Sequence, residues 1–361
     1  MDMMEWIFMG IKIAVVAVLL LQIAPIMAWV ERRGSALMQN RLGPNRVGPL
    51  GLIQSLADGV RFIFKEDFVP AHVESFYFVL APLVALVPAF MTMAVIPIAS
   101  PIALSDRILN FQVADLNVGF LYIFSIASLG VYSIIMAGWS SNNKYALLGS
   151  LRSSAQMISY ELSMGLSVVG IVMVFSSVHL LDITTGQGQA LIQLGPLSIP
   201  KWGIFVQPLG FLIFLISIFA ETNRLPFDLP EGESEIVAGY HLEYGAMKFA
   251  MLMMAEYNNM FVGSALIASL FLGGWQPLPG MMPLLGIAGL SGAVYEWARV
   301  GCEALSFFMK VGFFMWFFVW IRWTLPRFRY DQLMDLGWKV LLPLSLVNVL
   351  ATGALMYFGV I

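Results

Sequence analysis

Long apolar segments recur along the whole chain, and shorter polar connections separate them. Each segment holds about 20 residues, the number that a helix needs to cross a hydrocarbon core of about 30 Å. A helix that is apolar on every side is typical of a membrane span, since a helix on a soluble core keeps a polar face. The pattern predicts eight spans, near residues 6–30, 76–100, 118–138, 153–175, 203–220, 241–272, 302–323 and 339–360.

The composition supports this reading, because only 11% of the residues are charged and the mean hydropathy is +0.83. We therefore expect an all-α polytopic membrane protein with about eight transmembrane helices, forming one transmembrane domain over residues 1–361. The first span should be retained, since it has no basic start and no small-residue cleavage site before Glu31. The apolar run 281–295 is read as interfacial or re-entrant, within an outer loop at 273–301, because a ninth span would invert the basic cluster that follows.

Lys and Arg residues gather on alternate connections, and cytoplasmic loops normally carry this excess. The poorer side holds only Arg107, Lys201 and Arg299. Both termini are therefore predicted to lie outside. The richer side holds Arg32, Arg33, Arg41, Arg46, Arg61, Lys65, Lys144, Arg152, Arg224, Arg322, Arg327, Arg329 and Lys339.

Two loops on the basic side have distinctive patterns. The loop 31–75 contains a segment with apolar residues at helical spacing, predicted to form an amphipathic helix flat on the membrane interface, although an ordinary connector remains an alternative. The loop 221–240 cannot be one helix, because Pro226, Pro230 and Gly232 interrupt it. Its alternating carboxylates Glu231, Glu233 and Glu235 indicate either a solvated acidic loop or a closed, partly wet cavity.

Ionisable side chains also lie inside the apolar segments, where they are costly and usually functional. Lys248 and Glu256 are eight residues apart, about 80° around a helix, so both can line one side of span six, which also carries Glu243. A set of buried carboxylates with interspersed lysines favours a proton or cation relay, with helix-joining ion pairs as the alternative. The candidates are Glu161, Glu221, Glu243, Glu256, Lys248 and Lys310.

Resident cofactors are not expected. The single cysteine, Cys302, cannot hold an iron–sulfur cluster, and His72, His179 and His241 have no metal-ligand spacing. The sequence Gly186-Gln187-Gly188 lacks the third glycine and the strand–helix context of a dinucleotide loop.

Three motifs resemble those of the H subunit of respiratory NADH:quinone oxidoreductase, whose mitochondrial counterpart is subunit 1 of complex I. They are ERR followed by QNRLGPNRVGPLGLIQSLADGVRFIFKE, then ETNRLPFDLPEGESEIVAGYHLEYGAMKFAMLMMAEY, and IRWTLPRFRYDQLMDLGWKVLLPLSL. The likeness covers nearly all spans, while the segment 274–303 is longer than in the shortest members.

The resemblance implies a membrane subunit of a proton-translocating enzyme in a bacterial plasma (inner) membrane, with quinone as substrate. Span one, the amphipathic segment and span six would frame a quinone tunnel, and the glutamates would lead toward pumping subunits. FMN, iron–sulfur clusters and NADH would belong to partner subunits of the peripheral arm, with small membrane subunits, lipid and no nucleic acid as further partner expectations. Quinone-site candidates are Glu31, Arg32, Arg41, Asp58, Phe227, Asp228, Glu231, Glu233 and Glu235.

Two alternatives remain open at this point. The first is the equivalent subunit of a membrane-bound hydrogenase complex, which shares several of these motifs. The second is a free-standing cation/proton transporter, although no second copy of the 221–256 pattern supports the inverted repeats common in that class.

Overall fold

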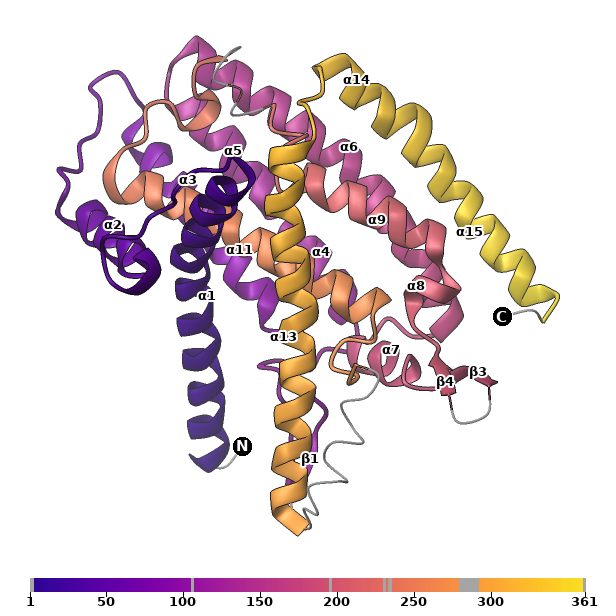
Figure 1. Ribbon diagram of the computed structural model, residues 1–361. Coiled ribbons are helices and arrows are strands. Elements are labelled where there is room, and N and C mark those ends of the chain that lie inside the picture. The colour runs from indigo at the N-terminus through magenta and orange to yellow at the C-terminus, as the bar shows by residue number, and fades with distance from the viewer. Residues whose placement is uncertain are drawn as a thin grey trace.

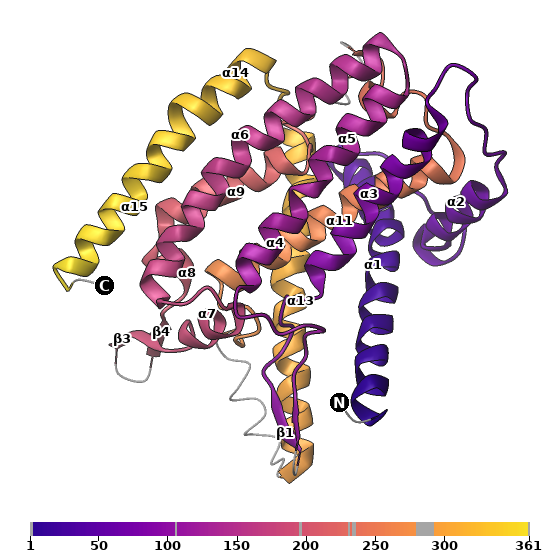
Figure 2. The ribbon, with the colours of Figure 1, turned by 180° about the vertical axis from the view of Figure 1, so that it is seen from behind.

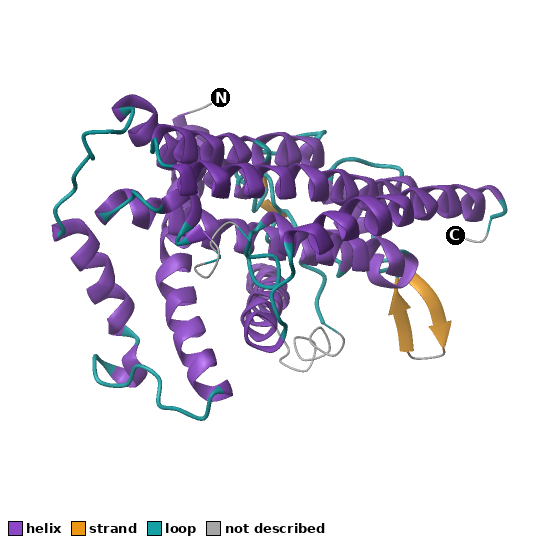
Figure 3. Ribbon diagram, turned by 90° about the horizontal axis from the view of Figure 1, so that it is seen from above, coloured by secondary structure: helices purple, strands orange, loops and turns teal. Residues whose placement is uncertain are grey.

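The computed structural model describes residues 3–104, 107–194, 197–229, 232, 236–278 and 292–359, and it is built almost entirely from helices (Figure 1). Strands occur in two short antiparallel hairpins, β1–β2 and β3–β4, the second of which projects at one edge (Figure 3). The all-α polytopic prediction is confirmed. The first half consists of α1 (Met3–Met38), η1 (Pro49–Gly51), α2 (Ile53–Phe64), α3 (Ser75–Met93), β1 (Ile102–Leu104), β2 (Arg107–Leu109), α4 (Gly119–Ala127), α5 (Leu129–Ser140) and α6 (Lys144–Phe175).

The second half continues the same helical plan from the far end of α6. Six helical segments of the described chain are long and apolar enough to cross a membrane, and α9 is a shorter apolar helix. The elements are α7 (Leu180–Gly186), β3 (Ala190–Leu194), β4 (Leu197–Pro200), α8 (Gly203–Val206), α9 (Pro208–Glu221), η2 (Gly239–His241), α11 (Ala246–Phe271), α13 (Gly292–Thr324), α14 (Tyr330–Asp335), the π-helical η3 (Leu336–Leu341) and α15 (Leu342–Tyr357).

Each predicted span overlaps a helix, although those at 203–220 and 241–272 are not among the six helices that could cross a membrane. Several boundaries also differ: α3 ends at Met93, α6 begins at Lys144, and three further differences concern candidate residues. α1 passes through Pro25 and continues to Met38, since no further proline stands before Pro44, so Glu31 belongs to the helix rather than to the loop 31–75. α11 begins only at Ala246, after Gly245, so the prediction that Glu243 shares span six is wrong. The expected outer loop 273–301 gives way to α13 from Gly292, while residues 279–291 lie outside the described chain.

The long helices pack side by side around two of their number, α6 and α11. α6 lies against α5, α9 and α15, while α11 joins α1, α3 and α13 (Figures 1 and 2). Small buried side chains such as Ser163, Ser167 and Ser217 line the α6 and α9 surfaces, and small residues allow close packing of membrane helices. The same requirement applies at Gly149, where an added Cβ would lie 2.7 Å from the Cα of Gly239.

The start of α1 and the end of α15 lie toward the end of the bundle that carries α7 and the hairpins (Figures 1 and 2). α14 and the turn after α9 lie at the opposite end. The amphipathic helix α2 lies outside the bundle beside α1, with Leu56, Ile63 and Phe64 strongly exposed.

Candidate functional site

Glu31 lies where α1 meets two other long helices, and its carboxylate has three partners. Its Oε1 accepts hydrogen bonds from Arg224, at 3.1 Å, and from Arg322 of α13, at 2.9 Å. Its Oε2 accepts a hydrogen bond from the Tyr257 hydroxyl of α11 at 2.8 Å. A buried carboxylate with this many donors is stabilised in its charged form.

Arg224 extends this contact to a second carboxylate. The guanidinium lies 3.6 Å from Glu256 and stacks 4.6 Å from the centre of the Tyr257 ring. Glu256 also accepts a hydrogen bond of 2.9 Å from the Tyr240 hydroxyl of η2. The Glu31, Arg224 and Glu256 side chains are only 9–12% exposed. We call Glu31, Arg224, Tyr240, Glu256, Tyr257 and Arg322 the Glu31 cluster.

The Glu31 cluster balances two carboxylates with two guanidinium groups. Its members come from α1, the turn after α9, η2, α11 and α13, so it joins segments that are remote in sequence. The Arg224 guanidinium pairs with both carboxylates. A change of charge at either carboxylate therefore changes the electrostatic environment of the other through Arg224.

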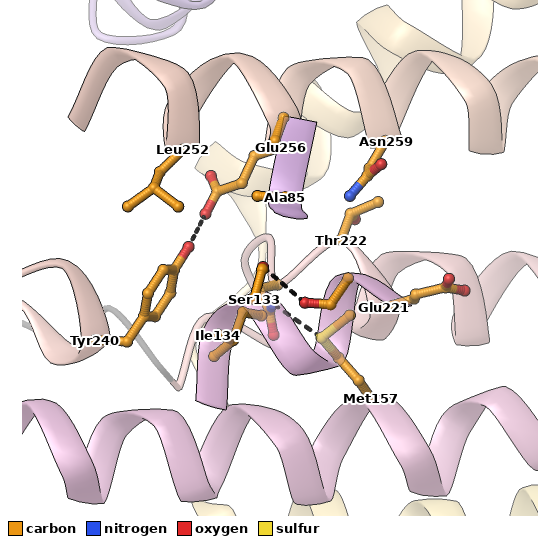
Figure 4. A pocket seen from close by; sticks show the side chains of 13 residues that line it. Ala85, Ser133, Ile134, Met157, Glu221, Thr222, Tyr240, Leu252, Glu256 and Asn259 are labelled. Carbon is orange, nitrogen blue, oxygen red and sulfur yellow. Dashed lines mark hydrogen bonds between the residues drawn. The ribbon is translucent and has the colours of Figure 1, made fainter. Parts of the chain in front are cut away.

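Glu221, the last residue of α9, lies next to this cluster but faces two small cavities. Each cavity has a volume of about 30 Å³, and Glu221, Thr222, Met157 and Asn259 line both of them. Glu256 lines the first, and Figure 4 shows Tyr240 and Glu256 on one side of it while Glu221 points away from them. A polar cavity of this size has room for ordered water, so water can lie beside Glu221 and Glu256.

The Oε2 atom of Glu221 is buried and has no hydrogen-bond partner within the described part of the chain. Glu161, on α6, is partly buried and near enough for its charge to interact with that of Glu221. Glu161, Glu221 and Glu256 therefore come from three packed helices, α6, α9 and α11, and Glu221 and Glu256 line one cavity between them. Such a group can accept or release a proton at modest cost only if water or a counter-charge reaches it.

The other three relay candidates lie apart from these carboxylates. Glu243 accepts a hydrogen bond of 2.8 Å from Asn143 and lies 3.7 Å from His72. Lys248, at the start of α11, forms an ion pair of 2.6 Å with Asp67. Both contacts fasten α11 and its preceding turn to neighbouring loops.

Lys310 lies at the opposite end of α11. Its ammonium group donates to the carbonyls of Leu272, Gly274 and Gln276 at 2.7–2.9 Å. These carbonyls end α11 and begin the next turn, and helix ends leave such acceptors without helical partners. Lys310 therefore closes the end of a helix, far along α11 from Glu256.

The quinone-site candidates on α1 and α2 form one contact. Arg32 pairs with Asp58 at 2.5 Å, and Gln54 donates to the same carboxylate at 3.1 Å. α2 is held on α1 further by Arg33, whose guanidinium donates to the Leu50 carbonyl at 2.9 Å. Arg41 is exposed and donates to Gln39.

Phe227 and Asp228 lie on the turn after α9. Phe227 is buried between the rings of Tyr160 and Phe328, and Asp228 pairs with Arg327 at 3.1 Å. Phe227 also lines an apolar crevice of about 220 Å³ between α9, α13 and η3. The candidates Glu231, Glu233 and Glu235 lie outside the described residues.

Sequence reasoning did not single out Arg224, Arg322, Tyr240 or Tyr257 as site residues. One signal was available for Arg224, since it stands between the apolar end of α9 and two prolines, where a cation needs a counter-charge. The tyrosines gave no signal, because buried aromatic residues at helical spacing are ordinary core.

Comparison with known proteins identifies the family. A family model described as NADH dehydrogenase matches residues 11–353. The H subunit of the NADH-quinone oxidoreductase of Bdellovibrio bacteriovorus is 44% identical, over 99% of this chain and 98% of the relative. The second H subunit of this enzyme in Geobacter sulfurreducens is 48% identical over 97% and 96%, and the H subunit of Thermomicrobium roseum is 48% identical over 94% of each. The resemblance indicated by the motifs is thus confirmed, and the chain belongs to the NADH dehydrogenase family.

Proposed function

We propose that this chain is the membrane subunit of a proton-translocating NADH:quinone oxidoreductase that admits quinone and couples its reduction to proton movement. The full-length similarity to H subunits supports the assignment to that complex. The Glu31 cluster beside the Glu221 cavities is the observation that carries the coupling role. Membrane localisation follows from the helices, and we infer a bacterial inner membrane with both termini outside.

Quinone would enter from the lipid beside α1, α2 and α11, which pack against one another. The exposed apolar face of α2 suits an interfacial position, and the Arg32–Asp58 pair lies on the α1 side of this helix. FMN, iron–sulfur clusters and NADH would be held by the peripheral-arm partners, and small membrane subunits would receive the proton signal. If Arg32 helps to orient quinone, Arg32→Gln will raise the KM for quinone while sparing NADH oxidation by artificial acceptors.

The coupling mechanism uses Arg224 as a shared counter-charge. Quinone reduction takes up two electrons, which the peripheral arm supplies, and two protons. A proton that passes to the quinone by way of Glu31 neutralises this carboxylate while it is bound there. Arg224 then has one charged carboxylate beside it instead of two. Its guanidinium therefore interacts more strongly with Glu256. Glu221, which faces water-sized cavities, is the group that takes up a proton in response, and Glu161 is the next group on α6.

The test is made on the assembled enzyme in proteoliposomes. Glu221→Gln and Glu161→Gln keep the side-chain shape but cannot exchange a proton. Each should lower the number of protons moved per NADH, while NADH oxidation by a water-soluble acceptor stays unchanged and reports intact assembly. Wild-type quinone reduction and proton pumping in both variants would refute the relay.

A further inference from the structure

Gln156 lies fully buried in the middle of α6, beside the site but outside it. Its amide nitrogen is 2.7 Å from the carbonyl of Ala220, 2.9 Å from the carbonyl of Phe227 and 3.2 Å from the side-chain oxygen of Asn223. Both backbone neighbours are acceptors, so the nitrogen rather than the oxygen of the amide must face them. One side chain thus joins α6 to three points of a segment more than 60 residues away.

The three acceptor residues, Ala220, Asn223 and Phe227, flank Glu221 and Arg224, which the proposed function uses. Ala220 directly precedes Glu221, Asn223 directly precedes Arg224, and Phe227 follows on the same turn. Asn223 has a φ of 51°, in the left-handed region that asparagine tolerates better than most residues. Its side-chain oxygen also accepts a hydrogen bond from Ser153 at 3.3 Å. The conformation of the turn therefore depends on donors that α6 supplies.

The hydrogen bond from Gln156 to Ala220 joins α6 to the end of α9, next to Glu221. The Ala220 carbonyl is at the end of α9, where helical partners run out. Gln156 is followed in α6 by Met157, which lines both cavities, so the same helix shapes the cavity and holds the turn. A shift of the turn would displace Glu221 from the cavities and Arg224 from its two carboxylates together.

We propose that Gln156 is a positioning residue for proton coupling: its amide fixes the turn that carries Glu221 and Arg224, and thereby sets how tightly quinone reduction drives proton movement. This inference rests on the proposed function, and it adds to the charged residues of the relay an uncharged residue that holds them in place. Because Gln156 acts through the turn, its loss changes the stoichiometry of pumping and not only the amount of enzyme.

Gln207 offers a matched control. Its side-chain amide is also buried, at 3% exposure, and its nitrogen donates to Thr352 of α15 at 2.7 Å. It lies at the other end of α9, away from the Glu31 cluster. Gln156→Met and Gln207→Met each remove one buried amide and keep a similar side-chain length, so both report the structural cost, but only the first removes support from the turn.

The experiment compares these variants as assembled complexes in proteoliposomes, normalised to NADH oxidation by a water-soluble acceptor. Gln156→Met removes the hydrogen bonds that hold the turn, and the loss of one or two such bonds corresponds to about a tenfold change. The rate of quinone reduction should therefore fall about tenfold, and the protons moved per NADH should fall at least by half. Gln207→Met should keep both quantities within about twofold. Equal behaviour of the two variants, or near wild-type pumping in Gln156→Met, overturns the proposal.

A second variant keeps the test decisive if Gln156→Met assembles poorly. Gln156→Glu retains the shape, but it can donate to the turn only when its carboxyl is protonated. Burial beside acceptor oxygens favours the protonated carboxyl, which donates one hydrogen bond where the amide donates two, so the protons that this variant moves per NADH should fall below the wild-type ratio. Gln207→Glu serves as the matched control and should not show this loss; equal ratios in the two variants contradict the positioning role.

Glu221→Gln, measured in parallel, separates this inference from the proposed function. Loss of pumping in Glu221→Gln with normal pumping in Gln156→Met would refute only the role of Gln156. Normal pumping in Glu221→Gln would refute the relay itself, and the inference with it.

Discussion

Glu31 pairs with Arg224 and with Arg322 through hydrogen bonds of similar length. We expect the pair with Arg224 to contribute more to the free energy of unfolding, so that most of the stability lost when Glu31 becomes neutral comes from this pair. The gross attraction across about 3 Å at an effective dielectric constant of 20 is ~5 kcal/mol for either pair. The pairs differ in exposure, since the Arg224 side chain is 9% exposed and that of Arg322 is 30% exposed. Water screens the second pair more strongly and also solvates Arg322 once Glu31 is neutral.

The change to make is Glu31→Gln, which keeps the shape and leaves Arg224 with the Glu256 carboxylate as its counter-charge in the cluster. Breaking a buried ion pair by removing one partner typically costs about 3–5 kcal/mol, and the remaining contact to Glu256 at 3.6 Å places the expected cost near ~3 kcal/mol. Double-mutant cycles then divide this cost between the pairs. We expect a coupling free energy of about 2 kcal/mol between Glu31 and Arg224, and below ~1 kcal/mol between Glu31 and Arg322.

The measurement is equilibrium unfolding of the purified chain in mixed detergent micelles, followed by tryptophan fluorescence. Arg224→Gln and Arg322→Gln provide the second corners of the two cycles. The exposed Lys339–Asp335 pair, at 71% and 60% exposure, serves as the control and should show little measurable coupling. A coupling to Arg224 no larger than that of the control would refute the claim that burial makes this pair the strong one.

Three further outcomes follow from contacts outside the Glu31 cluster. Burial disfavours the charged form of His179, but hydrogen bonds to Asp115 and Asp182 outweigh it and raise the pKa of His179 above 6.5. The stabilisation is complete below pH 6.5 and is lost as the pH rises through the raised value, so His179→Gln should lower the Tm of the complex more at about pH 6 than at about pH 8; an equal loss would contradict this assignment. Lys310→Met should destabilise the chain by about 2 kcal/mol or more in mixed micelles, because it removes a charged donor from three carbonyls, and an unchanged midpoint would exclude that role. A polarity-sensitive dye on Leu56→Cys should report an apolar environment in liposomes, and a water-like spectrum would exclude interfacial contact of α2.

The sequence predicted the helices well, because continuous apolar runs depend on local composition. The end of α1 and the start of α11 were misplaced for a specific reason. Polar residues such as Glu31 can continue a helix when distant groups pair with them, and Gly245 gives no local sign that α11 starts after it rather than before Glu243. Boundaries set by tertiary contacts cannot be read from periodicity alone.

The sequence singled out several carboxylates of the candidate site, but not the contacts that surround them. Glu161, Glu221 and Glu256 stood out because charge in an apolar run is costly. Their surroundings depend on Arg224 meeting Glu31 across 193 residues of sequence, and no spacing rule covers that distance. Lys310 shows the reverse case, since its partners are backbone carbonyls, which every residue carries.

The partners of Glu31 are synthesised long after Glu31 itself, and this delay affects the insertion of the first helix. Arg224 follows Glu31 by 193 residues, Tyr257 by 226 and Arg322 by 291. At a synthesis rate of about 5–20 residues per second, Arg224 leaves the ribosome roughly 10–40 s after Glu31, and Arg322 follows later still. During that interval the first helix is made without the cations that neutralise its carboxylate. Insertion of this helix must therefore tolerate a neutral glutamic acid, or one held at the water boundary, until Arg224 and Arg322 have been made.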